Sequence, residues 1–186
     1  MNDVIQAIQT RRSCRSFMPE AVKEEQLVEI VDAGLRAPSG FNSQSCHFTI
    51  LQNKEIVEKI SRAVQKTFAQ SAIPTLAQIA QEENFDVFYG APSIVVVSAN
   101  NKAITPQDDM AVASQNMMLA AESIGVASCW VSFGGALSEP ENVERFADLL
   151  GLPENHIAHH AIVFGYREGD VLETKKVKEG RVNTVK

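Results

Sequence analysis

The amino-acid sequence predicts a fold in which helices and strands mix, with helix taking the larger share. Two patterns predict this: apolar residues recur at helical spacing in several segments, and short β-branched or aromatic runs are bounded by Gly, Pro, Asn or Ser. Composition agrees, since 45% of the 186 residues are hydrophobic and 22% are charged. A chain of this length can bury a core without disulfides or a metal. We therefore expect a single domain over residues 1–186.

The expected helices are justified one by one. A short helix is predicted at Asp3–Thr10, and apolar residues at helical spacing predict further helices over residues 27–35 and 56–68. Residues 108–124 read DDMAVASQNMMLAAESI, a run of good helix formers that is apolar or small on nearly every side. We expect this helix to be buried all round, either in the core or against a partner subunit.

A last helix and four strands complete the expected elements. Ser138 and Glu141 predict a capping box, and Gly151 ends the helix that follows. The Ile94–Val97 run does not alternate with polar residues, so we expect that strand to be covered on both faces. Residues 74–90 read as a short helix plus loop, or as a lid. The expected strands are Cys46–Leu51, Ser93–Ser98, Val126–Val131 and Ala158–Tyr166.

Charge and cysteine usage exclude several classes of partner. Seventeen Lys and Arg against 23 Asp and Glu give a net charge of −6, which argues against a nucleic-acid or anionic-membrane surface. The longest aliphatic run is too short to span a bilayer, and the N-terminal residues do not read as a signal peptide. Three scattered cysteines without a CxxC pair are typical of reduced thiols. We expect a cytoplasmic protein with neither nucleic acid nor membrane as a partner.

The sequence shows few side-chain motifs for catalysis or metal binding. The sequence contains no GxGxxG, GxxxxGK, HExxH or GxSxG pattern. Its four histidines lack ligand spacing, and the pair His159-His160 runs into an apolar strand, so we interpret it as structural and expect no metal site. We name no catalytic side chain. The sequence points either to a bound cofactor or to no catalysis.

The segment after the first helix is the first candidate binding motif. Three guanidiniums and a hydroxyl, from Arg11, Arg12, Ser13 and Arg15, offer charge-assisted donors suited to a phosphate. In the alternative interpretation, Arg11 and Arg12 only complement the negative C-terminal dipole of the helix and are solvated.

A second candidate motif is the loop of small and polar residues at 37–44. The side chains of Ser39, Asn42 and Gln44 are able to meet the polar edge of a ligand, and Gly40 permits close approach of the backbone. An ordinary Asx-type turn is the alternative interpretation.

Two further segments offer ligand contacts. Gly134 and Gly135 end a strand, where backbone N–H groups can meet carbonyl or anionic atoms; a plain strand-to-helix turn is the alternative. The basic tail at residues 175–181 is either solvated or a second anchor for an anion.

In this order, the four segments resemble the FMN-dependent nitroreductase family of NAD(P)H:acceptor flavin oxidoreductases, along nearly the whole chain. The segment at 11–15 is similar to the flavin-phosphate motif of the family, and 37–44 to its Pro-Ser-x-x-Asn-x-Gln loop. Residues 125–135 are similar to the strand that leads to the flavin edge, and Arg181 to a C-terminal arginine. The sequence departs from the family where Ser45-Cys46 replaces a frequent Pro-Trp.

The resemblance implies an α+β fold: a mixed central sheet flanked by helices, built as an intertwined homodimer whose C-terminal segment extends onto the partner. FMN would lie at the interface, with NADH or NADPH as a transient co-substrate. The residues implied to bind the cofactor are Arg11, Arg12, Ser13, Arg15, Pro38, Ser39, Gly40, Asn42, Gln44, Asn84, Gly134, Gly135 and Arg181.

The resemblance also implies individual roles. Arg11, Ser13 and Arg181 would hold the phosphate end, and Arg15 would lie near flavin N1 and O2. Asn84 would contact the pyrimidine edge. The N–H groups around the glycine pair would meet N5 and O4, and the loop at 38–42 would come from the other subunit.

The implied reaction moves a hydride from NAD(P)H through flavin N5 to a small electron-poor acceptor by a ping-pong mechanism; a nitroaromatic, a quinone or another flavin would serve. Three alternatives stay open. One is a homodimeric flavin-binding protein without nicotinamide turnover. The others are a flavin-dependent dehalogenating or fragmenting relative, and an α+β dimer whose arginines bind another small phosphate.

Overall fold

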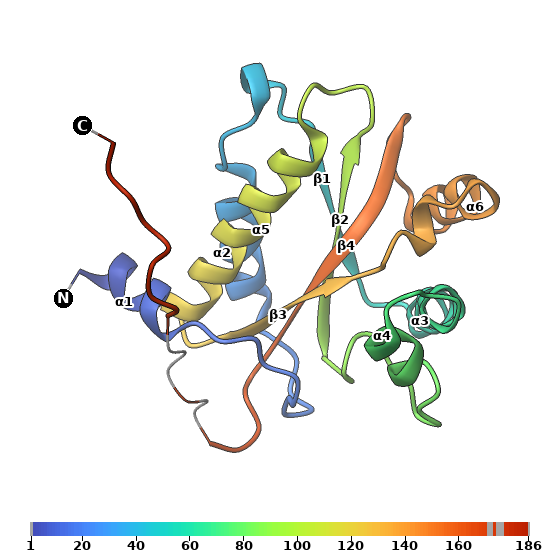
Figure 1. Ribbon diagram of the computed structural model, residues 1–186, viewed down its shortest axis with the longest axis horizontal. Coiled ribbons are helices and arrows are strands. Elements are labelled where there is room, and N and C mark those ends of the chain that lie inside the picture. Colours follow the sequence, from blue (N-terminus) through green and yellow to red (C-terminus); the bar gives the residue numbers. More distant parts are fainter. Residues whose placement is uncertain (1, 171–172, 174–176, 186) are drawn as a thin grey trace.

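A four-stranded sheet forms the centre of the molecule (Figure 1). The structure, a computed structural model, describes residues 2–170, 173 and 177–185. The strand order is β1-β2-β4-β3. The strands are β1 (Cys46–Leu51), β2 (Ser93–Asn100), β3 (Ala127–Ser132) and β4 (His156–Gly165).

The three pairings between these strands are all antiparallel, so the expected mixed sheet is wrong for them. The connection from β1 to β2 shows why. After β1 the chain makes a helical excursion and returns to the end of the sheet that it left, where Leu51 pairs with Ile94. A connection that returns to the same end produces an antiparallel neighbour even when it contains helices. A parallel contact occurs at an isolated bridge between Ser13 and Ser128.

Helices cover both faces of the sheet: α2 and α5 pack on one face, and α3, α4 and α6 lie on the other (Figure 1). The predicted helices are all present, and the stretch at 74–90 opens with a short helix followed by a loop. The helices are α1 (Asp3–Thr10), α2 (Glu24–Leu35), α3 (Lys54–Ala69), α4 (Pro74–Ile79), α5 (Pro106–Ser123) and α6 (Pro140–Leu150), with short 3-10 turns η1 (Gly40–Asn42) and η2 (Ala136–Ser138). None of the helices described is long and apolar enough to cross a membrane.

The predicted capping box at the start of α6 is wrong. Glu139 is the N-cap residue, it makes no side-chain cap hydrogen bond, and Ser138 instead ends η2. Pro140 occupies the first helical turn. Proline favours that position because its fixed φ suits a helix and its missing N–H would be unpaired there anyway.

β2 is covered on both faces, as the sequence predicted. Residues Ser93 to Ala99 are all buried. The strand is hydrogen-bonded on both edges, by β1 and β4, and its two faces contribute to two separate apolar clusters. Val96 belongs to the cluster under α3 and α6, and Val95 to the cluster under α2 and α5.

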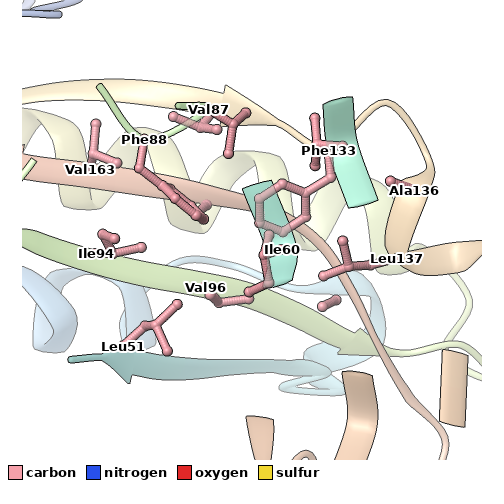
Figure 2. Packing of buried hydrophobic residues seen from close by; sticks show 14 of the residues in the cluster. Leu51, Ile60, Val87, Phe88, Ile94, Val96, Phe133, Ala136, Leu137 and Val163 are labelled. Atoms are coloured by element: carbon pink, nitrogen blue, oxygen red, sulfur yellow. The ribbon is translucent and has the colours of Figure 1, made fainter. Parts of the chain in front are cut away.

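The cluster under α3 and α6 is rich in aromatic side chains (Figure 2). Phe88 and Phe133 meet edge to face, with ring centroids 6.1 Å apart and planes at 83°. Ile60, from α3, is fully buried beside them. Aromatic pairs in this geometry add to the stabilisation that comes from the buried area itself.

The opposite cluster depends on α5, which crosses the sheet beside α2. Met110 and Met117 face the sheet, and Gly34 of α2 lets the helices approach closely, since a Cβ there would lie 2.8 Å from Met117 Cγ. Within one chain this helix is buried on one side, so the core part of the expectation is met and burial of the other side against a partner stays a prediction. Val112 is 40% exposed, and Gln115 is exposed on the next turn of the helix.

Candidate functional site

A cavity of about 470 Å³ lies at the edge of the sheet formed by β3. Arg15, Asn84 and Tyr89 contribute polar atoms to its wall, and Trp130 and Ser132 enter from β3. The apolar part of the wall is formed by Phe68, Leu76, Ile79, Phe85 and Val131. A volume of this size and a mainly apolar lining with a few polar groups are typical of a small-molecule site. The structure therefore brings the predicted residues Arg15 and Asn84 into one cavity.

Arg15 is held against a tyrosine that the sequence analysis missed. Its guanidinium carbon lies 5.7 Å from the centre of the Tyr89 ring, a cation–π distance. A side-chain hydrogen bond with Tyr89 raises the pKa of Arg15 above its ordinary value, and an arginine side chain is charged at physiological pH in any case. The wall of the cavity therefore holds a positive charge at Arg15, alongside the acidic residues Glu82 and Asp86.

The turn that presents Tyr89 is built by a neighbouring aspartate. Asp86 accepts hydrogen bonds from the N–H groups of Phe88 at 2.9 Å and Gly90 at 2.7 Å. Tyr89 between them has a φ of 57°, a left-handed conformation that non-glycine residues rarely adopt. The contact of Asp86 with Phe88, two residues on, is an Asx turn, and the turn formers Asp86 and Gly90 on either side of Tyr89 are the sequence signal that would have found it.

The arginine–serine segment continues along the outside of β3. Cys14 N–H donates to Ser128 O at 2.9 Å, and this contact fixes the position of Ser13 against the strand. Arg11 is half-buried beyond the C-terminal end of α1.

Arg12 is committed to the backbone. Its guanidinium donates to the carbonyl oxygens of Gln9, Arg11 and Glu173 at 2.8, 2.7 and 3.0 Å. The alternative interpretation, in which an arginine serves the C-terminal end of the helix, therefore describes Arg12 well.

Gly134 and Gly135 follow the cavity end of β3, both with positive φ. At Gly134 a Cβ atom would lie 2.6 Å from the ring of Phe68, whereas nothing lies within 4 Å of a Cβ at Gly135. The N–H of Gly134 donates to Ser132 Oγ at 3.2 Å. The turn thus leaves open space over the second glycine.

Trp130 rests on a buried histidine. The rings of Trp130 and His160 stack at a centroid distance of 3.9 Å and an angle of 14°, and His160 Nε2 lies 2.7 Å from Ser114 Oγ. Burial lowers the pKa of His160 to about 3, and the charge of His159 contributes in the same direction. The imidazole is therefore neutral at physiological pH. This packing supports the structural interpretation of His160.

The predicted loop at 37–44 lies elsewhere. Pro38, Ser39 and Gln44 line a second cavity of about 250 Å³ between α2 and α5. In Figure 1 the short helix η1 of this loop, light blue, lies at the top, at the N-terminal end of α5 and far from α4. Within one chain, the structure separates this loop from Arg15 and Asn84.

An aspartate missed by the sequence analysis anchors that loop. Asp109 is 3% exposed and accepts hydrogen bonds from the N–H of Gly40 and from three hydroxyl groups. Burial by itself would raise the pKa of Asp109, but these four hydrogen bonds outweigh it and hold the pKa below the ordinary value. The side chain lies in the first turn of α5, where an acidic residue is common, so no local pattern distinguishes it.

The C-terminal tail is the last predicted segment. Arg181 is exposed, and Figure 1 shows the tail running past α1, away from α4. Lys175 and Lys176 lie outside the described residues. Within the described part of the chain, the tail touches the binding segment through the Glu173 carbonyl oxygen and Arg12.

Solved structures and characterised proteins resemble this chain along nearly its full length. A nitroreductase with bound FMN from Bacteroides fragilis is 34% identical with a TM-score of 0.88, and one from Desulfitobacterium hafniense is 26% identical with the same score; both comparisons cover 100% of both chains. The FMN reductase (NAD(P)H) of Bacillus subtilis is 27% identical, covering 98% of this chain and 73% of the relative. The NADPH-flavin oxidoreductase of Vibrio harveyi is 28% identical, covering 96% and 70%.

The sequence model of one protein family matches residues 8–166. The matched range includes the arginine–serine segment, the loop at 37–44 and the glycine pair, in the predicted order. The chain belongs to the Nitroreductase family.

Proposed function

We propose that this chain is an FMN-dependent oxidoreductase, formed as one nitroreductase-like domain over residues 1–186. It moves a hydride from NADH or NADPH to a small electron-poor acceptor such as a nitroaromatic, a quinone or a flavin, in a ping-pong cycle. The observation that carries the proposal is the cavity at β3, where Arg15 and Asn84 face an apolar wall. The FMN-bound relatives of similar fold support it.

The residues present suit the cofactor. A flavin is a flat apolar ring system with a polar edge and a phosphate on a flexible chain. The aromatic and aliphatic side chains of the cavity suit the ring, while the Arg15 charge and the Asn84 amide suit the polar edge. Arg11 and Ser13 follow the same strand edge and are suited to the phosphate end. The open space over Gly135 admits a close backbone approach.

When bound, FMN would supply the hydride-transfer chemistry between the nicotinamide and the acceptor. The chain positions the ring, excludes water with its apolar walls and provides a positive charge. Arg15 serves that last purpose, because the reduced cofactor carries more negative charge than the oxidised one and a fixed cation nearby stabilises it.

The proposed active unit is a homodimer whose C-terminal segment, with Arg181, extends onto the partner. The separation between the 37–44 loop and Arg15 supports it, because in a two-fold dimer the loop of one subunit can complete the cavity of the other. The exposed side of α5, including Val112, supplies apolar surface for such an interface.

The visible spectrum of the purified protein, followed by anaerobic titration with NADH and then NADPH, tests the function. We expect flavin absorption at about 450 nm that bleaches on titration. A yellow protein that neither nucleotide bleaches would contradict the reductase function and favour a flavin-binding protein. A colourless protein that does not take up added FMN would contradict the cofactor assignment.

The role of Arg15 has its own test. In Arg15→Ala we expect the reduction potential of bound FMN to fall, because the reduced cofactor loses a neighbouring positive charge. Arg62→Ala is the control, since Arg62 is an exposed residue of α3 that pairs with Glu58 at 3.0 Å. Equal potentials in wild type and Arg15→Ala would contradict the role.

A further inference from the structure

We propose that Asp109 is a positioning residue: its buried carboxylate holds the 37–45 loop in the shape that contacts the flavin of the partner subunit. The inference rests on the proposed function, in which this loop forms part of an FMN site. It assigns the preorganisation of the loop to one side chain on another element, α5.

The two carboxylate oxygens divide the loop between them. Asp109 Oδ1 accepts from Gly40 N–H at 2.9 Å and from Thr105 Oγ1 at 2.9 Å. Asp109 Oδ2 accepts from Ser45 Oγ at 2.6 Å and from Ser43 Oγ at 3.3 Å. Three of the four donors belong to the loop, on both sides of its tip. One side chain therefore ties the start and the end of the loop to the first turn of α5.

The backbone of the loop explains why a tether is needed. Phe41, Asn42 and Gln44 have φ values of 53°, 55° and 48°. Residues other than glycine are strained at positive φ, and such conformations persist only when the surrounding structure holds them. The exposed Phe41 side chain, at 91%, adds no packing within its own chain. From outside the loop, Asn100 N–H donates to Ser45 O at its end, and the hydrogen bonds to Asp109 tie both Gly40 and the Ser43–Ser45 side to α5.

Gly40 fits the same arrangement. A Cβ atom at Gly40 would collide with Thr105 Oγ1, the hydroxyl that shares Asp109 Oδ1 with the Gly40 N–H. Gly40 is therefore needed for close contact with α5 rather than for its own φ. An ionised carboxylate suits this place because it accepts at two oxygens, whereas an asparagine retains a single acceptor oxygen.

The test compares Asp109→Ala and Asp109→Asn with the same substitutions at Asp108. Asp108 is an exposed neighbour in the same first turn of α5, so it controls for the charge at the helix N-terminus. Two quantities are measured: hydrogen exchange of the backbone amides of residues 40–45 in the FMN-free protein, and the dissociation constant of FMN from quenching of its fluorescence.

We expect Asp109→Ala to speed exchange in the loop while β1 and β2 stay protected, and to raise the dissociation constant of FMN by about tenfold or more. Asp109→Asn should change both quantities less, because its oxygen still accepts the Gly40 N–H. Both Asp108 variants should match wild type.

The inference is overturned if Asp109→Ala binds FMN within about twofold of wild type, or if its exchange rises throughout β1 and β2 and Asp109→Asn gives no rescue. A wild-type protein that does not bind FMN would overturn the proposed function, and this role in flavin binding with it. The two failures are distinguishable because loop exchange is measured without FMN.

Discussion

The two faces of the sheet are packed with different kinds of side chain. Under α3 and α6, the core is aromatic and aliphatic, and the buried hydroxyl of Ser61 accepts the N–H of Val87. Under α2 and α5, methionines lie in the core, and the same side of the molecule buries Asp109, Ser114 and His160.

The two kinds of core contribute differently: apolar burial stabilises the fold, whereas buried polar groups hold particular side chains and loops in place. Burying apolar surface stabilises the folded state in proportion to the area buried, and apolar atoms need no hydrogen-bond partner. Buried polar groups require donors or acceptors at defined places, so they fix particular geometries at a cost in desolvation. His160 supports Trp130, and Asp109 holds the loop. The α2/α5 face therefore positions Trp130 and the 37–45 loop, while the opposite face supplies the apolar wall of the β3 cavity.

The largest effect is expected from a truncation on the apolar face. Ile60 is fully buried in α3, so Ile60→Ala should lower the free energy of unfolding by about 2–5 kcal/mol, through lost transfer energy and the cavity left behind. Urea unfolding measures it. Ile73→Ala is the matched control, because Ile73 is 57% exposed and should change stability by no more than about 0.5 kcal/mol. Equal losses at both sites would contradict the importance of this core.

On the polar face, the histidine predicts a pH dependence. The pKa of His160 is lowered to about 3, first by burial and then by His159, whereas an unfolded histidine titrates near about 6.5. Between these values the unfolded chain binds a proton that the native state does not. The free energy of unfolding should therefore fall as pH falls through this window, with His160 contributing about 1.4 kcal/mol per pH unit.

Urea unfolding at several pH values checks this contribution. In His160→Gln the free energy of unfolding should depend less steeply on pH than in wild type, because unfolding takes up about one proton fewer. The exposed neighbour serves as control, because His159→Gln retains the buried imidazole and should keep the slope. An unchanged slope in His160→Gln would show that His160 titrates normally in the folded protein.

The glycine pair at the end of β3 separates backbone strain from packing. Gly134→Ala and Gly135→Ala both place a Cβ on a residue with positive φ, which costs about 1–2 kcal/mol. Gly134→Ala also brings its Cβ to 2.6 Å from Phe68, so it should be the more destabilising, by about 1 kcal/mol or more. Thermal unfolding of the two variants measures the difference. Equal losses would mean that the Phe68 ring moves aside freely.

The last prediction concerns chemical reactivity. Burial raises the pKa of Cys46, on β1, to about 11. The thiolate reacts and the thiol does not, so alkylation of Cys46 should be about 100-fold slower near neutral pH than that of an ordinary thiol, and should still be rising at pH 10. Labelling with iodoacetamide, followed by mass spectrometry, measures it. Cys46→Ser defines the background from the buried Cys14 and Cys129. Fast labelling at pH 7 would contradict the burial of the thiol.

Local patterns predicted much of the fold. The bounds of α1 and β1 follow directly from apolar spacing and β-branched runs, and the non-alternating Ile94–Val97 run predicted a strand covered on both faces. The capping box failed because Pro140 competes for the start of α6. A helix start depends on which of several neighbouring residues caps best, and that choice is made within one turn.

The site was predicted in part. Arg15 and Asn84 do share a cavity, and the loop at 37–44 does contain the turn residues that its composition indicated. Tyr89, Asp109 and the stacking of Trp130 on His160 were missed because each acts across a long sequence separation. Tyr89 meets Arg15, Trp130 meets His160, and Asp109 meets Gly40. No local spacing records such a pair.

The sequence by itself determined the helices and strands and the order of the candidate binding segments. It also showed that the common catalytic and metal-binding motifs are missing from it. These properties depend on residues that are neighbours along the chain, where periodicity and turn chemistry act. Only the tertiary structure decided the antiparallel order of the sheet, the division of the binding segments between two places, and the role of Asp109. Those outcomes depend on which end of the sheet each connection returns to, and on which donors surround a buried carboxylate after packing.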